Sequence, residues 1–331
     1  MIFPLYRCPA TVAFLDDDEA WIEMLADVMP EHWPVTLYLH PADCISCLRL
    51  QSPLQESLDW QQRDMIDRWR EGRPLVPQIL QYWQQDPAAR YGLTQVCVVD
   101  YSMPAMNGLQ ALEQLSPWVG ARILLTGRAD EQIAVDAFNQ GLIEQYIPKQ
   151  VDGIARKLTQ TIQRMLDAPR PEQALIWRST LSREQLQLLA APGVADGLAA
   201  CLESHQLAEY FVLGDPFGVL ALDADGQAFW LQLERPDRVE ELAELAACRS
   251  IGNAEIEEIR LGRKLVDIEF RQSLGLDEPA WAPTTRVGDS PGLLAGLFRV
   301  PPQLCPGASR SYRGYLRACG PREPVELSSL D

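Results

Sequence analysis

Over its first half the chain alternates short β-prone runs with longer segments whose apolar residues recur every three or four positions. Runs of the first kind predict strands, and segments of the second kind predict helices. Their alternation is typical of a doubly wound parallel sheet covered by helices. Strands are predicted at 11–15, 34–39, 95–100, 121–126 and 144–149, and helices at 19–29, 41–50, 107–115, 129–140 and 150–167. We therefore expect an α/β domain with a five-stranded parallel sheet at residues 8–168.

One segment interrupts this alternation. Residues 52–93 lie between the second helix and the third strand and are mostly helical in character. A Gly-Arg-Pro sequence at 72–74 divides the segment, which favours a helical hairpin inserted into the α/β domain. An extension of the second helix that covers an exposed face is an equally open interpretation.

The second half of the chain has a different organisation. A Pro-rich sequence predicts a linker at 169–181. Beyond it, helices are expected at 182–190, 194–205, 238–250 and 253–275, β runs at 209–213 and 217–233, and an irregular Pro/Gly/Arg-rich tail from 279. This pattern predicts a second domain of the α+β class at 182–331, of a type that the sequence does not identify.

The composition limits where the protein works and what it binds. No apolar stretch approaches the roughly 18 residues of a membrane span, and the N-terminus lacks the basic segment of a secretion signal. Eight cysteines in 331 residues are too sparse for a disulfide scaffold, which favours the reducing cytoplasm. A formal net charge of −17 makes binding to nucleic acid or to an anionic membrane unfavourable, because like charges repel.

Polar side chains follow the predicted parallel strands where the strands end. Asp16 and Asp17 follow the first strand and Asp100 ends the third, whereas Thr126 and Lys149 end the fourth and fifth. Ligands of open parallel sheets gather at this edge. Three crowded carboxylates need a compensating cation, and Mg²⁺ prefers such oxygen ligands, commonly together with a phosphate oxygen. The sequence therefore predicts phosphoryl transfer to a carboxylate, with an ammonium and a hydroxyl stabilising the phosphoryl oxygens.

Four motifs follow one another along the chain in this order: LDDD (15–18), VVDYSMPAMNG (98–108), LLTG (124–127) and YIPK (146–149). Together they resemble the flavodoxin-like receiver domain of two-component response regulators, the CheY-like family, over roughly residues 10–168. The resemblance implies a role for each matching residue: Asp100 as phosphoacceptor; Asp16, Asp17, Asp100 and the main-chain carbonyl of Ser102 as Mg²⁺ ligands; Thr126 and Lys149 as partners of the phosphoryl group; and Thr126 with Tyr146 as the switch residues.

The loop after Asp100 suits a phosphoacceptor, whereas two other features of the chain depart from the pattern of the family. Met103-Pro104 and Asn107-Gly108 predict a rigid turn that holds the loop clear and leads into the next helix. Gln150 follows the motif lysine where the family usually has proline, so the loop that orients the lysine loses a constraint. The insertion lengthens the spacing between the acidic pair and the phosphoacceptor to 83 residues, but it leaves the pocket residues in place.

Three further features have alternative interpretations. A haloacid-dehalogenase-type phosphatase also uses a strand-end aspartate, but its D-x-D pattern is absent because Tyr101 and Ser102 follow Asp100. Cys44 and Cys47 share a helix face, yet no second pair is spaced to complete a zinc site. Arginines of the tail interleave with tyrosines and form a candidate anion-binding set, namely Arg310, Arg313 and Arg317.

These observations predict a response regulator of a phosphorelay, with a sensor histidine kinase or phosphotransfer protein as its partner. The receiver is expected to catalyse only its own phosphorylation and dephosphorylation. Phosphorylation should pull Thr126 and Tyr146 inward and shift the face formed by 129–140, 144–149 and 150–167, which offers a homodimer surface. The output domain is expected to act through a protein or small-molecule partner. The alternatives are a transcriptional regulator that binds DNA through this domain, and an output domain that is an unrecognised enzyme.

Overall fold

The computed structural model describes residues 3–104, 106–127, 131–168, 170–249, 251–289 and 292–325. Contacts within the chain define two compact units, each assembled from three separate segments. The α/β unit comprises Pro9–Asp59, Pro87–Ala168 and Tyr315–Asp331, and the antiparallel unit comprises Met1–Cys8, Trp60–Asp86 and Pro169–Gly314. The segment expected as an insertion at 52–93 is therefore shared, with its middle part in the antiparallel unit.

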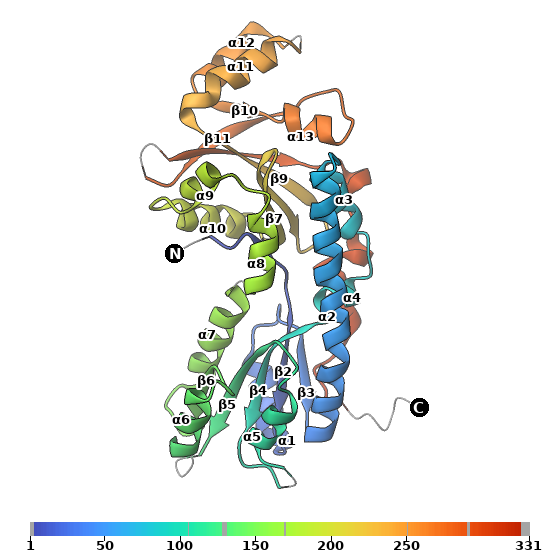
Figure 1. Ribbon diagram of the computed structural model, residues 1–331, viewed down its shortest axis with the longest axis vertical. Helices are drawn as coiled ribbons and strands as arrows, with labels where there is room; N and C mark the ends of the chain where they lie inside the picture. The colour runs from blue at the N-terminus through green and yellow to red at the C-terminus, as the bar shows by residue number, and fades with distance from the viewer. Residues whose placement is uncertain are drawn as a thin grey trace. The chain divides into compact units, whose positions relative to one another are not determined.

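The α/β unit contains a five-stranded parallel sheet (Figure 1). Its strands are β2 (Thr11–Leu15), β3 (Val35–Tyr38), β4 (Thr94–Asp100), β5 (Ala121–Thr126) and β6 (Gln145–Pro148). Its helices include α1 (Glu19–Val28), α4 (Pro87–Tyr91), α5 (Gly108–Gln114), α6 (Glu131–Asn139) and α7 (Ile154–Asp167). The strand order is β3-β2-β4-β5-β6, so the order reverses between β2 and β4. This is the flavodoxin-like order, which confirms the fold class expected for the first half.

Both faces of this sheet are buried, which explains why its central strands are nearly continuous apolar runs. Side chains of β2 alternate between two hydrophobic clusters: Ala13 and Leu15 lie in one, and Val12 and Phe14 in the other. All four are at most 1% exposed, and fully burying a Leu or Phe side chain stabilises the fold by roughly 1.5–3 kcal/mol. This packing fixes the strand register, and the register determines which residues emerge at the carboxyl edge.

The second helix is much longer than the sequence predicts. α2 (Pro41–Arg70) is a single helix of 30 residues, although Pro53 lies inside it. The left-handed Gly72, with φ +96°, follows, and the chain then enters α3 (Leu75–Tyr82). The structure thus combines the two interpretations of this segment, because the second helix is extended and a second helix begins after the predicted break.

The part of this segment from Trp60 to Asp86 contributes to the core of the antiparallel unit. Trp83 is fully buried, and its Nε1 donates a hydrogen bond of 2.8 Å to Oε1 of the buried Glu209. Nε1 of the buried Trp177 donates to Oε1 of Gln62 at 2.9 Å. Both indole rings pack against Phe211. Two long-range hydrogen bonds and an aromatic cluster therefore hold the segment in place.

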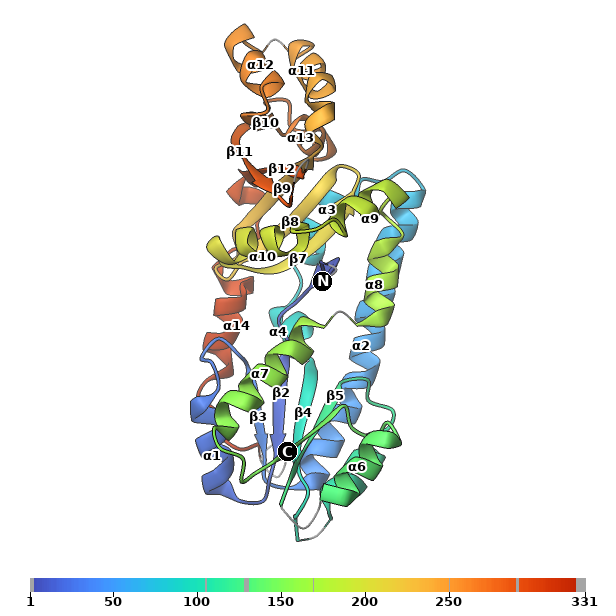
Figure 2. The same cartoon turned by 90° about the vertical axis from the view of Figure 1, so that its left-hand side faces the viewer.

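The antiparallel unit is built on a seven-stranded sheet. Its strands are β1 (Tyr6–Arg7), β7 (Leu207–Gly214), β8 (Phe217–Asp223), β9 (Ala228–Glu234), β10 (Lys264–Val266), β11 (Trp281–Val287) and β12 (Leu293–Arg299). The order is β1-β7-β8-β9-β12-β11-β10, with neighbours antiparallel. Figure 2 shows β7, β8 and β9 side by side. The α+β class expected for the second half is confirmed.

Several helices accompany this sheet. They are α8 (Pro171–Arg178), α9 (Arg183–Leu189), α10 (Val194–Ser204), α11 (Val239–Ala247), α12 (Asn253–Arg260) and α13 (Ile268–Ser273), and α14 (Tyr312–Cys319) follows the last strand. α8 occupies most of the segment expected as a linker. Within the described residues no single helix is long and apolar enough to cross a membrane; α9 and α10, bent by 74°, pass that test only as a pair.

Two expectations for the second half are wrong. The helix predicted at 253–275 ends at Arg260 in a Schellman motif, where Gly262 has φ +64° and the amide of Arg263 donates to the carbonyl of Glu258. The chain then forms β10, so the apolar spacing that resembled a helix belongs to three short elements. The tail predicted as irregular from 279 contains β11 and β12. Pro283 is tolerated in β11 because it lies outside the ladder with β12, which begins at Thr284.

Candidate functional site

The carboxyl ends of the parallel strands bring five polar residues together. Asp16 and Asp17 follow β2, and Asp100 is the last residue of β4, on the two sides of the point where the strand order reverses. Thr126 ends β5, and Lys149 follows β6 directly. The structure therefore places all five at the sheet edge where the sequence predicted them.

A lysine joins two of the carboxylates. Nζ of Lys149 lies 2.7 Å from Oδ2 of Asp16 and 2.8 Å from Oδ1 of Asp100. Carboxylate oxygens of Asp16, Asp17 and Asp100 lie within 4.8 Å of one another. Lys149 is paired with two of these three carboxylates. Among the described residues the ionised cluster therefore retains negative charge that a divalent cation can offset. Hard oxygen ligands at this spacing fit Mg²⁺.

Burial and hydrogen bonding together determine the pKa values of Asp16 and Lys149. Asp16 is only 2% exposed, and burial raises the pKa of its carboxyl, although the hydrogen bond from Lys149 opposes that shift. Burial would lower the pKa of Lys149, but its hydrogen bonds to Asp100 and Asp16 outweigh burial, and the net shift is upward. Lys149 therefore stays protonated at neutral pH and remains a fixed positive charge beside both acids.

The three consecutive aspartates after β2 have different surroundings. Asp16 is buried and its Oδ1 accepts a hydrogen bond of 3.1 Å from the backbone N–H of Asp18. Asp17 is exposed beside it. Asp18 is the N-cap of α1, and its side chain accepts a hydrogen bond from the backbone N–H of Trp21. Only the first two aspartates therefore belong to the cluster, whereas the third stabilises the helix that follows.

The loop after Asp100 is held by close backbone packing. The backbone N–H of Ser102 donates to Oδ2 of Asp100 at 2.9 Å, which orients the carboxylate. Gly108 packs so closely on the Asp100 carbonyl that a Cβ there would clash with its oxygen. Asn107 caps α5 in a reciprocal capping box with Gln110. The Asn-Gly pair thus returns the chain to Asp100 and starts the next helix, as the sequence indicated.

Thr126 and Tyr146 differ in their environments. Thr126 is fully buried, and its Oγ1 has no hydrogen-bond partner among the described residues. Leaving a buried hydroxyl unpaired costs about 1–3 kcal/mol, so the fold loses stability by keeping the Thr126 hydroxyl in this position. Tyr146 is half-buried and packs against the hydrophobic cluster that contains Ala134 and Ala137 of α6.

Lys149 reaches both carboxylates although Gln150, and not the proline that is usual in the family, follows it. Its backbone N–H donates to the carbonyl of Thr126 at 2.8 Å, which prolongs the pairing of β5 with β6 by one residue. Its Nζ also lies 5.3 Å from the centre of the Trp21 ring, in a cation–π contact. Sequence reasoning missed Trp21, and the only signal was an aromatic residue in the first turn after the acidic run.

Two of the three candidate arginines of the tail, Arg310 and Arg313, contact other residues of the protein. Nη1 of Arg313 lies 2.7 Å from both carboxylate oxygens of Asp225, and Nη1 of Arg310 donates to Oε1 of Gln84 at 3.1 Å. Arg317 is exposed on α14. Arg322, further along, donates to the backbone carbonyls that end α1 and follow it, those of Ala26, Met29, Pro30 and Trp33.

No protein-family model and no curated protein sequence matches the chain. Among solved structures, the response regulator LqsR of Legionella pneumophila is similar over 96% of this chain and 97% of its own, with 19% sequence identity and a TM-score of 0.63. This chain has the fold of that response regulator. The likeness to response regulators, first indicated by the four motifs, is thus confirmed at the level of the fold.

Two other similar structures have lower scores. An adenylate cyclase from Rhodopirellula baltica has 16% identity over 48% of this chain and 91% of its own, with a TM-score of 0.33. A CheY-like receiver domain protein from Methanospirillum hungatei JF-1 has 19% identity over 48% of this chain and 95% of its own, with a TM-score of 0.30. Such scores support no inference about the function of either unit.

Proposed function

We propose that this chain is a response regulator of a phosphorelay, phosphorylated on Asp100 in a Mg²⁺-dependent reaction. The observation that carries the proposal is the double contact of Lys149 with Asp16 and Asp100. This contact brings a nucleophilic carboxylate, a second acid and a fixed positive charge together at the edge of the sheet where the strand order reverses. Ligands of this fold bind at that point.

The residues present fit a magnesium ion. Asp16, Asp17 and Asp100 would hold it with their carboxylates, together with the main-chain carbonyl of Ser102. Bound Mg²⁺ supplies positive charge that neutralises the oxygens of the incoming phosphoryl group.

Asp100 is the proposed nucleophile because it ends a rigid strand and its second oxygen is oriented by Ser102. One carboxylate oxygen forms a bond to phosphorus while the bond from phosphorus to the donor breaks. The leaving atom of the donor takes the electron pair and then a proton from water. Asp100 thereby loses its carboxylate charge and carries the charged phosphoryl group instead, while the electron pair leaves with the donor. Lys149 can then pair with a phosphoryl oxygen while it stays paired with Asp16.

Thr126 is the proposed sensor of the phosphoryl group. Its unpartnered hydroxyl gains an acceptor only when a phosphoryl oxygen is near, so the phosphorylated state has a hydrogen bond that the other state lacks. Such a difference shifts a two-state equilibrium. We propose that Tyr146 follows this movement and that α6, β6 and α7 form the responsive face, through which the chain can form a homodimer.

The α/β unit then serves as the receiver and the antiparallel unit as the output. A sensor histidine kinase or a phosphotransfer protein is the proposed phosphoryl donor, and the cytoplasm the proposed compartment. We expect the output unit to act through a protein or small-molecule partner rather than through DNA. The acidic charge of the chain supports this choice, as do the internal contacts of Arg310 and Arg313.

Labelling with radioactive acetyl phosphate tests the proposal. The wild-type chain should be labelled in Mg²⁺ and not in excess chelator, and Asp100→Asn should abolish labelling. Asp27→Asn changes an exposed aspartate of α1 and serves as the matched control. Retained labelling of Asp100→Asn would show that another residue accepts the phosphoryl group.

A further inference from the structure

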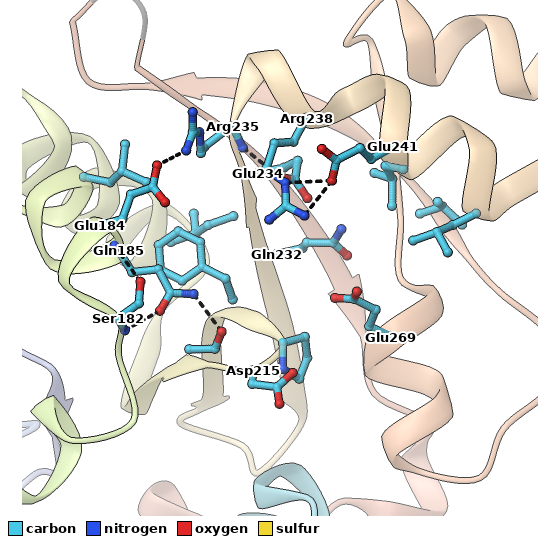
Figure 3. A pocket seen from close by; sticks show the side chains of 18 residues that line it. Ser182, Glu184, Gln185, Asp215, Gln232, Glu234, Arg235, Arg238, Glu241 and Glu269 are labelled. Atoms are coloured by element: carbon cyan, nitrogen blue, oxygen red, sulfur yellow. Dashed lines mark hydrogen bonds and ion pairs between the residues drawn. The ribbon is translucent and has the colours of Figure 1, made fainter.

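The antiparallel unit contains a cavity of about 290 Å³ that lies outside the carboxylate cluster. Residues of α9, β9, α11 and α13 line it, together with the turn between β7 and β8 (Figure 3). All of these elements belong to the same compact unit. The volume corresponds to about ten water molecules, so the cavity suits a ligand of roughly ten non-hydrogen atoms.

Acidic side chains outnumber basic ones around this cavity. The described lining residues include five carboxylates (Glu184, Asp215, Glu234, Glu241 and Glu269) and two guanidinium groups (Arg235 and Arg238). Both guanidinium groups are already paired, Arg235 with Glu184 and Asp237, and Arg238 with Glu241. Three carboxylates of the lining are therefore left in excess.

None of these three carboxylates has an ion-pair partner among the described residues. Oε1 of Glu234 accepts a hydrogen bond from the backbone N–H of Arg235 at 2.9 Å. The charge of Arg238, which is paired with Glu241, acts on Glu234 and Glu269 from nearby without forming a salt bridge to either. Burial raises the pKa of Glu234, and it also raises the pKa of Glu269, where the nearby charge of Asp215 adds to the shift. A cation placed among the three would remove this electrostatic penalty.

Other groups in the cavity limit the shape of such a cation. The amide of Gln232 lies between Arg238 and Glu269 in Figure 3 and has no hydrogen-bond partner among the described residues. It can donate to or accept from a polar group of a ligand. Phe217 and Leu242 supply apolar wall, which suits a short hydrocarbon segment. A phosphate or carboxylate ligand is disfavoured because it would meet the excess acids.

We propose that this cavity binds a small organic cation that carries one or two amino or guanidino groups on a short aliphatic chain. The charged ends contact Glu234, Glu269 and Asp215, and Gln232 bonds to a polar group between them. Ligand occupancy gives the output unit a signal of its own, and it does not depend on phosphorylation of the receiver.

Isothermal titration calorimetry of the full chain with 1,4-diaminobutane and with agmatine tests this inference. Salt at about 0.15 M screens the general attraction of a polyanion for cations. The uncharged 1,4-butanediol is the matched control ligand and should not bind. At least one of the two cations should bind with one-to-one stoichiometry, and the Asp100→Asn variant should bind it equally well, which separates this inference from the proposed phosphorylation.

Variants locate the binding site. Glu234→Gln and Glu269→Gln should each weaken binding by at least about tenfold, because each removes a charge that contacts the ligand. Glu244→Gln changes an exposed acid of α11 outside the cavity lining and should leave the affinity unchanged. Absence of binding by both cations, equal binding of the diol, or equal weakening by all three substitutions would overturn the inference.

Discussion

The ammonium of Lys149 lies 2.8 Å from a carboxylate oxygen of Asp100 and, at the same time, 2.7 Å from Asp16. Both acids are almost completely buried, whereas Lys149 is 24% exposed. The lysine therefore compensates two charges that the protein interior would otherwise penalise. Before any metal binds, it is the principal counterion of the cluster among the described residues.

Lys149→Met should destabilise the protein by roughly 2–4 kcal/mol in chelator, because two buried acids lose their cation. Mg²⁺ should recover part of this loss, since it supplies the missing positive charge. The variant should also bind Mg²⁺ more tightly than the wild type, because the lysine no longer competes for the carboxylates. Urea denaturation with and without Mg²⁺ measures both effects. Lys157→Met, an exposed change on α7, is the control, and an equal effect of Mg²⁺ on both variants would contradict the prediction.

Thr126→Val should leave the unphosphorylated protein as stable as the wild type, or more stable by up to about 1 kcal/mol. The substitution replaces an unpaired buried hydroxyl by a methyl group of similar shape. Labelling by acetyl phosphate should persist, and the structural response to labelling should weaken. Denaturation and hydrogen exchange measure these effects. In the control Thr159→Val, a hydroxyl that donates to the carbonyl of Ala155 at 2.8 Å is lost, and stability should fall. Equal losses in both variants would refute the reasoning.

The parallel sheet and its polar edge could be predicted because each depends on local sequence. Side chains buried on both faces produce apolar runs, and a residue such as Asp100 stands out where a run stops. Strand order then brings those ends together without further information. The contact of Trp21 with Lys149 could not be predicted in this way, since it depends on how the start of α1 lies relative to the residue that follows β6.

The antiparallel half was less predictable because its elements are short and pair over long distances. β1 has two residues and is a strand only because Tyr6 and Arg7 pair with β7. Leu265 and Val266 lie within the helix predicted at 253–275, yet Gly262 ends the helix before them and both residues pair with β11 in a strand. Tertiary pairing overrides local propensity at such positions.

Trp83→Phe should destabilise the antiparallel unit by about 1–3 kcal/mol, because the buried Glu209 loses the indole N–H that donates to it. The prediction tests whether the segment from Trp60 to Asp86 is a structural part of that unit. Trp60→Phe is the matched control, since Trp60 is 67% exposed; its effect should stay within about 0.5 kcal/mol. Urea denaturation followed by circular dichroism provides the comparison. Equal effects of the two substitutions would indicate that Trp83 contributes no specific stabilisation.

Asp267→Asn should change how stability depends on pH. Asp267 is 1% exposed, and burial raises the pKa of its carboxyl although the amide of Ala280 and the guanidinium of Arg271 both bond to it. The folded protein therefore holds this proton more tightly than the unfolded chain, in which the pKa is near 3.8. The stability from this group is fully present below that value and falls as the pH rises through the folded pKa, by at most about 1.4 kcal/mol per pH unit.

The free energy of unfolding of the wild type, minus that of Asp267→Asn, should accordingly decrease with rising pH across this window and become constant above it. Urea denaturation at a series of pH values gives this difference directly. Asp237→Asn provides a control of opposite sign, because the hydrogen bond from Arg235 lowers the pKa of Asp237. For that exposed residue the difference should increase with pH. A rising difference at Asp267 would mean that its bonds to Ala280 and Arg271 outweigh the effect of burial.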